Sequence, residues 1–343
     1  LSATGVASWN AVTFAAAPAG VCKVSGTKVT VIGAGTCTVT ASQAGNANYT
    51  AAADVAQSFT VAPLAASVTP DAANKAFGAA DPIPLTTGTL TGFLPGDAVT
   101  ATYSRTGTDS LGTYTISATL APAGVLGNYT ITYNTALFTI GLGRAAPFAV
   151  LGGTGASSCT GVSTAYGNVG VYPSGTISGF PSPCAISAPG DGSVHLNDAI
   201  ASAAQADVTT VNAALAGMTN AVDLTGQDLG GLILTPGVYR FTSSAQLTGE
   251  LKLNGPANGI WVFQIGSTLT TAASSKVTLQ GTANAGNVYW QVGSSATIGA
   301  TNAPFVGNII ATATVGLGAS TSLTGRALAK ATVIMDTNII TLP

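Results

Sequence analysis

The fold is indicated most clearly by a short pattern that returns near the end of the chain: SSATI at residues 294–298, ATVGL at 313–317 and ATVIM at 331–335. An earlier copy, STLTT, lies at residues 267–271. Successive copies are offset by 27, 19 and 18 residues, and the excess in the first interval falls on a Gly-, Ala- and Asn-rich stretch at residues 281–287. A repeat of this length, with one strand in each copy, predicts a solenoid in which each coil stacks on the next.

Within this pattern, apolar residues alternate with short hydroxyl side chains. Alternation predicts strands with one buried side and one side in water. The side chains expected to face water are Thr268, Thr270, Ser295, Thr297, Thr314 and Thr332. A simpler interpretation is that Thr is only a good strand former on a solvated face. A third column of the repeat offers a competing face, formed by Thr301, Asn302, Ser320, Ser322 and Thr337.

Another set of strands in the same repeat is apolar at both alternating positions. It comprises residues 239–241, 260–265, 288–292 and 305–310. Strands of this kind are covered on both faces of their sheet. The only cover that the sequence offers is one helix.

That helix is predicted over about residues 196–216, where apolar residues recur at spacings of three and four until Gly217 ends the pattern. The apolar residues are Leu196, Ile200, Ala203, Ala204, Val208, Val211 and Leu215. Because they form a one-sided stripe, we expect the helix to pack along the solenoid. Asp191, Ser193 and Asn197 are interpreted as turn and N-cap residues before it.

The chain before the solenoid contains two small β modules. Short alternating runs separated by Gly predict antiparallel strands in residues 1–62 and again in residues 63–141. A Gly-rich joint at residues 141–144 then leads into a domain that spans residues 145–343. The fold class is therefore mainly β, with two small antiparallel modules and a solenoid flanked by one long helix.

The composition excludes several classes of function. Of 343 residues only 10 are Lys or Arg and 12 are Asp or Glu, which makes 6% charged against about 25% in an ordinary domain, whereas Thr alone counts 50. Ten cations spread over this length cannot neutralise a run of phosphates, so nucleic acid is excluded as a partner. No apolar run approaches the roughly 18 residues of a membrane span. Leu1 is not a natural start and no signal peptide is visible, so we expect a mature or trimmed form.

Chemistry at a catalytic centre is also disfavoured, because the chain has one His and one Glu. His195 with Asp191 and Asp198 offers a metal or acid/base site as an alternative to the turn interpretation. Polysaccharide lyases and hydrolases with β-helical folds need a cluster of carboxylates or basic groups. From Gly237 onward the only acids are Glu250 and Asp336. We therefore expect no enzyme, no cofactor and no metal.

The four cysteines form two local pairs, Cys22 with Cys37 and Cys159 with Cys184. Neither pair has the close spacing of a zinc site, and a single His cannot complete two such sites. Disulfides are favoured over buried free thiols, which places the protein in an oxidising compartment, secreted or at the cell surface.

Residues from about 145 to 343 resemble the ice-binding protein family of bacteria, diatoms and fungi. The blocks that carry the resemblance are residues 148–152, 167–171, 223–232, 234–239, 261–271, 290–297, 305–309 and 325–329. The resemblance implies a discontinuous, triangular, right-handed β-helix with one long helix beside it, and adsorption to ice that inhibits growth and recrystallisation. It also implies a cap on one end of the β-helix in the segment that contains Cys159 and Cys184. The family's Thr-Ala/Gly-x-Thr/Asn motif on the ice face has only a near match at residues 271–274.

The two N-terminal modules resemble repeats of bacterial surface proteins. Residues 112–116 and 127–133 are similar to the MBG domain, and residues 35–41 and 47–49 to the end of a bacterial immunoglobulin-like repeat. This implies a spacer or adhesive stalk, with cell-surface or matrix components as candidate partners. The function predicted for the whole chain is an extracellular ice-binding protein. The alternative is a carbohydrate-binding adhesin at the cell surface, in which the β-helix is only a rod.

Overall fold

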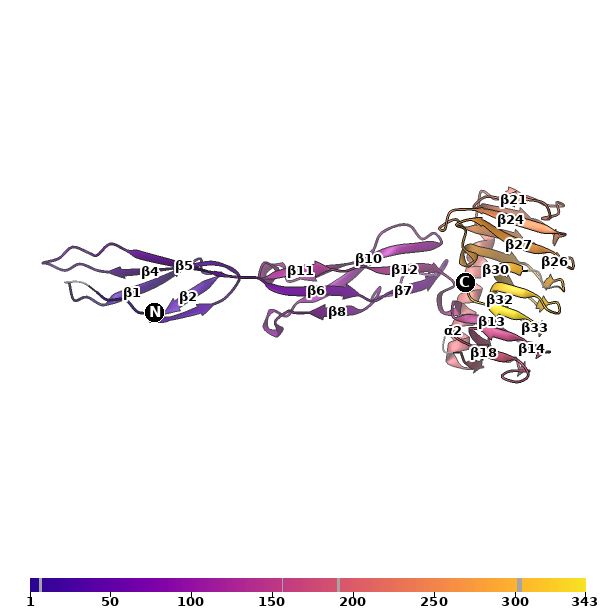
Figure 1. Cartoon of the computed structure of the whole chain (residues 1–343), viewed down its shortest axis with the longest axis horizontal. Coiled ribbons are helices and arrows are strands. Elements are labelled where there is room, and N and C mark those ends of the chain that lie inside the picture. Colours follow the sequence, from indigo (N-terminus) through magenta and orange to yellow (C-terminus); the bar gives the residue numbers. More distant parts are fainter. Residues whose placement is uncertain (6–7, 156, 190–191, 301–303) are drawn as a thin grey trace. The chain divides into compact units, whose positions relative to one another are not determined.

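The computed structural model describes residues 1–5, 8–155, 157–189, 192–300 and 304–343. The chain folds into two compact units. The first comprises Leu1–Ala73, Pro82–Thr106 and Tyr114–Phe138, and the second comprises Asn74–Asp81, Gly107–Thr113 and Thr139–Pro343. Figure 1 labels many of the strands and helix α2.

The beginning of the first unit is a small β module closed by a disulfide. Its strands are β1 (Val12–Ala17), β2 (Cys22–Ser25), β3 (Lys28–Val31), β4 (Gly35–Gln43) and β5 (Val55–Val61). Strands β1, β4 and β5 form an antiparallel sheet, and β2 and β3 form a hairpin. Cys22 and Cys37 are bonded to each other and buried. The predicted pairing is confirmed, and the bond stabilises a module whose own core is small.

The following strands form two facing sheets. They are β6 (Leu64–Pro70), β7 (Ala73–Ala76), β8 (Gly88–Thr91), β9 (Thr100–Arg105), β10 (Gly112–Ala121), β11 (Tyr129–Tyr133) and β12 (Ala136–Gly141), with short helical turns η1 (Pro95–Asp97) and α1 (Ala123–Leu126). One sheet has the order β7-β12-β10-β9 and the other β11-β6-β8. The pairing of β11 with β6 is parallel, which differs from the antiparallel prediction.

The rest of the second unit is a three-sided β-helix, as the repeat predicts. The helix face consists of β20 (Val222–Asp223), β22 (Gly237–Phe241), β25 (Trp261–Ile265), β28 (Val288–Val292), the second halves of β30 (Pro304–Ala311) and β32 (Ser322–Ala329), β13 (Phe148–Gly152), β16 (Asn168–Val171) and β19 (Val194–Leu196). The threonine face consists of β23 (Ala245–Leu247), β26 (Leu269–Thr271), β29 (Ala296–Ile298), β31 (Val315–Leu317), β33 (Val333–Asp336), β14 (Ser157–Thr160) and β17 (Ile177–Ser178).

The third face completes the triangle. It consists of β21 (Ile233–Leu234), β24 (Glu250–Gly255), β27 (Lys276–Gly281), the first halves of β30 and β32, β34 (Ile339–Thr341), β15 (Thr164–Tyr166) and β18 (Ala185–Ser187). Two further short turns are η2 (Gly143–Ala145) and η3 (Ala285–Asn287). Strand pairing in the β-helix is parallel, so equivalent residues of successive coils lie side by side.

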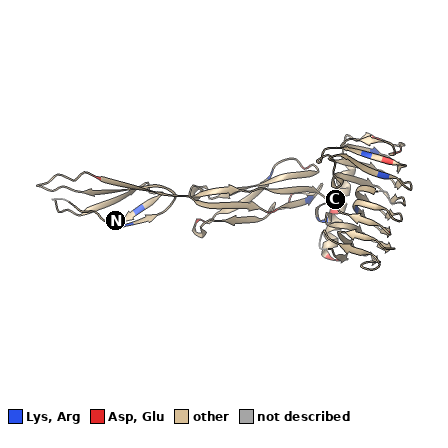
Figure 2. Ribbon diagram, in the orientation of Figure 1, with Lys and Arg blue, Asp and Glu red and all other residues tan. Residues whose placement is uncertain are grey.

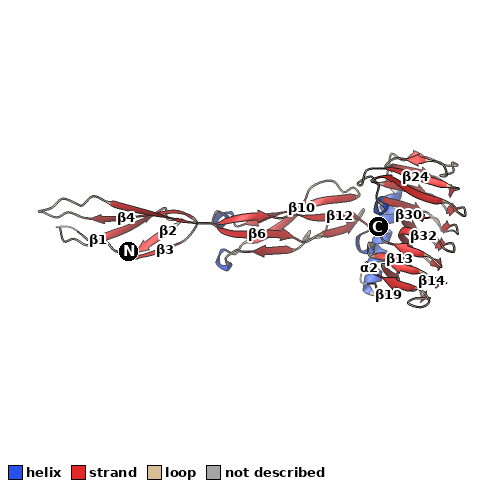
Figure 3. Cartoon of the chain, in the orientation of Figure 1, coloured by secondary structure: helices blue, strands red, loops and turns tan. Residues whose placement is uncertain are grey.

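The coils do not stack in chain order. After β19 the chain passes into helix α2 (Ala199–Ala216), which at 18 residues is about 27 Å long and runs beside the stack to its other end (Figure 3). The stack then grows back from β20, and its last coil pairs with the first, β32 with β13 and β34 with β15. This is the discontinuity that the resemblance implies.

Helix α2 packs on the helix face through Ala201, Ala204, Val208, Val211 and Leu215. It begins three residues later than the periodicity predicts. Its apolar stripe also excludes three residues assigned to it from the sequence, since Leu196 ends β19, Ile200 is 52% exposed and Ala203 lies outside the apolar cluster. The helix is not the only cover of these strands, because Ala76, Leu111, Leu142 and Ala145 join the same apolar cluster.

Two buried amides connect the helix to the coils. Gln205 Nε2 donates to the carbonyls of Gly152 (2.7 Å) and Ala329 (2.9 Å). Gln264 Nε2 donates to the carbonyls of Leu215 (2.7 Å) and Met218 (2.9 Å) at the end of the helix. These bonds satisfy backbone acceptors that would otherwise be buried without a partner.

Aromatic rings fill the interior. Phe263 stacks on Trp290 with ring centroids 4.0 Å apart, Tyr239 continues the stack at 5.5 Å from Phe263, and Phe305 lies 5.1 Å from Trp290. The order of the rings follows from the register, in which Tyr239, Phe263 and Trp290 pair in successive coils.

Strands β30 and β32 turn the corner between two faces without a loop. The turn occurs at Gly307 (φ +115°) and Gly325 (φ +157°), which are paired. The sequence prediction that placed Phe305 and Val306 in the helix-covered column is therefore wrong, because the bend puts them on the third face. No feature of the apolar pattern marks the bend.

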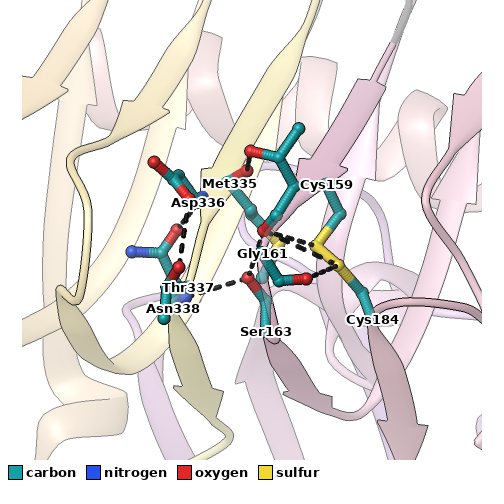
Figure 4. The surroundings of a disulfide bond; sticks show 9 residues. Cys159, Gly161, Ser163, Cys184, Met335, Asp336, Thr337 and Asn338 are labelled. Carbon is teal, nitrogen blue, oxygen red and sulfur yellow. Dashed lines mark hydrogen bonds between the residues drawn. A yellow bond between two sulfur atoms is a disulfide. The ribbon is translucent and has the colours of Figure 1, made fainter.

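Figure 4 shows the corner between the threonine face and the third face near the disulfide of Cys159 and Cys184. The side chain of Asn338 is fully buried there, and its Nδ2 donates to the carbonyl of Gly318 (2.8 Å). The backbone N–H of Asn338 donates to Ser163 Oγ (2.9 Å), which is also buried. The second predicted disulfide is thus confirmed. It lies near a corner that is also held by hydrogen bonds of the buried side chains of Ser163 and Asn338.

We expect Gly325→Ala to lower the free energy of unfolding by about 3 kcal/mol, because its Cβ would lie 1.9 Å from the carbonyl oxygen of Gly307. Chemical denaturation measures this difference. The control is Gly316→Ala in the neighbouring strand, whose Cβ would meet nothing closer than 4.0 Å and should change stability by less than about 0.5 kcal/mol. Equal stability of both variants would contradict the corner geometry.

Candidate functional site

The threonine face presents two parallel files of side chains, one residue per coil. In β26 and β29 the first and last residues are buried and the middle one, Thr270 or Thr297, is exposed. The register extends this central file in both directions, and its members are Gln246, Thr270, Thr297, Gly316, Ile334, Ser158 and Ser178. Thr270 and Thr297 are direct neighbours in it.

The flanking file lies two residues earlier in each coil. Its members are Ser244, Thr268, Ser295, Thr314 and Thr332. Their backbones are fixed from coil to coil, because the carbonyls of Thr268, Ser295, Thr314 and Thr332 each accept an N–H from the adjacent coil, at 2.8 to 3.1 Å. The six residues predicted from the sequence therefore divide into two in the central file and four in the flanking file.

Hydroxyl groups on this face also bond to one another. Thr268 Oγ1 donates to Ser244 Oγ (2.8 Å), and Ser295 Oγ accepts the backbone N–H of Thr314 (3.4 Å). Such bonds restrict side chains that are already stiff because Thr is β-branched. The face is therefore a fixed arrangement of hydroxyl and methyl groups.

Sequence reasoning missed six residues of this face: Ser244, Gln246, Gly316, Ile334, Ser158 and Ser178. The signal for the first two was present, because SSAQL at residues 243–247 follows the same pattern as SSATI at 294–298. Gly316 and Ile334 occupy Thr positions without a hydroxyl, so a search for Thr passes over them. Ile334 is 45% exposed.

Charge distinguishes the threonine face from the third face. On the strands of the threonine face the only ionisable group is Asp336, at the end of β33. The third face carries Glu250, whose carboxylate lies 3.7 Å from Lys252 Nζ and 3.4 Å from Lys276 Nζ. A hydrogen bond from Thr278 and these two lysines lower the pKa of Glu250. Figure 2 shows blue and red on β24 and β27, whereas most of the stack is tan.

The competing set of residues does not form one strand surface. Ser320 (φ +62°) and Thr337 (φ +55°) are turn residues at the corner after the threonine face, and Ser322 begins β32. Thr301 and Asn302 lie outside the described residues. The near match to the family motif starts at Thr271, which is buried and accepts the N–H of Gly299 with its hydroxyl.

The residues around His195 serve the fold. The ring is buried, with Nδ1 2.8 Å from Asp198 Oδ2 and Nε2 3.3 Å from Asn168 Nδ2. Asp198 is the N-cap of α2 and accepts the N–H of Ala201 (2.8 Å), which corrects the expectation that Asn197 or Ser193 caps it. Asp191 lies outside the described residues. Within the described part of the chain, no three His, Cys, Asp or Glu side chains are placed to hold a metal ion.

We expect Asp198→Ala to cost about 1 kcal/mol of stability at pH 7 through loss of the cap, and Asp198→Asn much less, because Asn caps equally well. The hydrogen bond from the backbone of Ala201 and the contact with His195 lower the pKa of Asp198 below its ordinary 3.8. The carboxylate's contribution is therefore present above pH 3.8 and is lost as the pH falls through the lowered value.

Urea denaturation at pH 7 and again below pH 3 measures this dependence. The stability difference between the unmodified protein and Asp198→Ala should shrink at the lower pH, where the carboxylate is protonated. A constant difference at both pH values would contradict the assignment of Asp198 as the capping carboxylate.

Comparison with known proteins identifies families for two parts of the chain. The family model "Ice-binding-like" matches residues 150–341, and the model "MBG domain (YGX type)" matches residues 66–139. An ice-binding protein from Nostoc sp. (strain HG1) is 47% identical over 202 residues, which are 57% of this chain and 72% of that protein. One from Colwellia sp. is 30% identical over 230 residues, 60% of this chain and 85% of that protein.

Solved structures are similar over the same region. The crystal structure of an ice-binding protein from the Antarctic ascomycete Antarctomyces psychrotrophicus has a TM-score of 0.54 and 36% identity, covering 59% of this chain and 97% of that one. An ice-binding protein from an Antarctic biological consortium has a TM-score of 0.54 and 40% identity, covering 59% and 90%. In the described part of the chain, no helix has the length and apolar character needed to cross a bilayer.

Proposed function

Because the chain belongs to the ice-binding-like protein family, with more than half of its residues matched, we propose that it adsorbs to ice crystals through the threonine face. The observation that carries the choice of face is the pair of uncharged files, with Thr270 beside Thr297 and four further hydroxyl residues in register next to them. The relatives and the similar solved structures are named as ice-binding proteins, which supports the same activity here.

The spacing of the two files supports contact with a crystal. Stacked strands are about 4.8 Å apart, and residues on the same side of one strand are about 6.6 Å apart. The hydroxyl and methyl groups therefore form a nearly flat, two-dimensional grid with fixed periods. Ice is the ligand for which a rigid periodic array of small neutral groups is suited, because its own surface is a periodic array of hydrogen-bonding water.

The mechanism follows from this grid. Hydroxyl groups of Thr270 and Thr297 bind water, while their methyl groups and Ile334 limit the orientations of the water between them. Water held in this arrangement joins the growing lattice and anchors the protein. Ice can then grow only between anchored molecules, where its surface must curve, and the curvature lowers the local freezing point and slows recrystallisation.

The remaining features fit a protein that acts outside the cell without catalysis. Two disulfides are stable in an oxidising compartment. The MBG match over residues 66–139 supports a role for the N-terminal modules as a spacer at the cell surface or in the secreted protein. The described residues of the threonine face include no catalytic nucleophile with a general base beside it. We therefore propose only binding for this face.

We expect Thr297→Tyr and Thr314→Tyr each to abolish most thermal hysteresis, because a large ring on either file lifts the flat face away from the crystal. Measurements of hysteresis and of ice-affinity partition test this, with circular dichroism to verify the fold. Thr341→Tyr is the control, since Thr341 is exposed on the third face. Full activity of the first two variants, or loss in the control, would show that another face binds ice.

An increase in activity should result from extending the central file. Gly316 follows Thr297 in the register and has open space around its Cβ position, so Gly316→Thr should fold and add a third hydroxyl in line. The double change Gly316→Thr with Ile334→Thr should add a fourth. We expect thermal hysteresis at equal concentration to rise in this order, and unchanged or lower values would count against the central file.

A further inference from the structure

A pocket of about 470 Å³ lies in the second unit, at the corner where the helix face meets the third face. Its walls include Ala257 and Asn258, from the turn between β24 and β25, and the turn at residues 284–287 between β27 and β28. The pocket is also lined by Gly112, Thr113, residues 139–142, Ala146 and Pro343. This corner is the one that the threonine face does not border, so the pocket is separate from the proposed ice site.

Arg326 projects into this pocket with only part of its hydrogen-bonding capacity used. It follows Tyr289 and Asn308 in one file of the register. Its Nε donates to the carbonyl of Ala146 (2.7 Å), and one terminal nitrogen donates to Asn308 Oδ1 (2.7 Å). Asn308 is itself fully buried and fixed by its bonds to the carbonyls of Gly286 and Val288. The guanidinium is therefore held in a set position.

The charge of Arg326 has no carboxylate partner among the described residues. Burial lowers the pKa of its guanidinium to about 10, which leaves it charged at neutral pH. Arg326 is half-buried, so part of its hydration is lost without a counter-charge, and an anionic ligand would offset that loss. The second terminal nitrogen of the guanidinium is free to bind it.

Tyr289 supplies a second donor in the same pocket. Its side chain is only 5% exposed, and in the described structure its hydroxyl has no hydrogen-bond partner. Burial raises the pKa of Tyr289 to about 12, so the hydroxyl stays protonated. The hydroxyl oxygen is not enclosed by protein, so its O–H can donate to a ligand in the pocket, and beside a guanidinium the fitting partner is an anionic oxygen.

The rim of the pocket is rich in amides. Asn258 is exposed, and its amide makes no hydrogen bond in the described structure. Asn284 Oδ1 accepts the N–H of Gly286, and Asn287 Nδ2 donates to the carbonyl of Ala257. This leaves an amide donor on Asn284 and an amide acceptor on Asn287. Paired donors and acceptors at a rim are suited to sugar hydroxyl groups, each of which both donates and accepts.

We propose that this pocket binds a carboxylate-bearing sugar residue, such as a uronate unit of an acidic polysaccharide. Arg326 and Tyr289 bind the carboxylate, and the asparagines at the rim bind the ring hydroxyls. The pocket volume lies within the range of small-molecule sites and accommodates one sugar ring. This site is independent of the ice proposal and gives the protein a means of attachment to a charged glycan.

Titration of the full chain with sodium galacturonate, followed by calorimetry or ligand-observed NMR, tests the proposal. We expect a Kd on the order of 1 mM for the single sugar. Galactose, which lacks the carboxylate, and acetate, which lacks the ring, should each bind at least about tenfold more weakly. Equal binding of galactose or acetate, or no saturable binding of galacturonate about tenfold above that concentration, would overturn the proposal.

Tyr289→Phe provides the matched variant, because it removes only a hydroxyl that makes no bond in the described structure and should fold normally. It should weaken galacturonate binding about tenfold and leave thermal hysteresis unchanged. Thr297→Tyr should show the reverse result, losing hysteresis while still binding galacturonate. Unchanged galacturonate affinity in a folded Tyr289→Phe protein would exclude this pocket as the site.

Discussion

Parallel pairing between successive coils is the constraint on which the rest of the β-helix depends. Each coil hydrogen-bonds to the next in register, so a residue type repeated in the sequence becomes a file of identical positions in space. The same register builds the ring stack of Phe263 and Trp290 inside and the Thr270–Thr297 pair outside. The aromatic core and the proposed ice face are thus two sides of one arrangement, fixed by the same backbone bonds.

Much of this arrangement could be predicted from the sequence, because residues that align in the repeat occupy equivalent positions in successive coils. Val315 and Val333 align in the repeat and are paired in the structure, and both disulfides follow from the spacing of four cysteines. The predictions are wrong where the local apolar pattern does not determine the position of a residue in the tertiary structure. Leu196 is apolar yet ends an edge strand before the helix. The bend at Gly307 moves Phe305 to another face, although the residues on both sides of the bend are similarly apolar.

Other features depend on residues that are distant in the chain, and no local pattern carries them. The cap by Asp198 is decided by one residue among several suitable ones. The pocket around Arg326 and Tyr289 needs strands β28 and β32, two turns and the end of β12 to come together. The absence of a hydroxyl at Gly316 and Ile334 also has meaning only once the register shows that they continue the line of Thr270 and Thr297.

The path of the chain through the stack sets the order in which the β-helix can be completed. The strand β13, at residues 148–152, has its partner β32 some 170 residues later, and α2 carries the intervening chain to the far end. During synthesis the early coils therefore leave the ribosome with an unpaired edge. The entropy of closing so long a loop is lost before the stabilising contacts between β13 and β32 can form. The edge strands of these coils gain their partners only once β32, β33 and β34 have been made, so the domain assembles as a whole rather than coil by coil from β13.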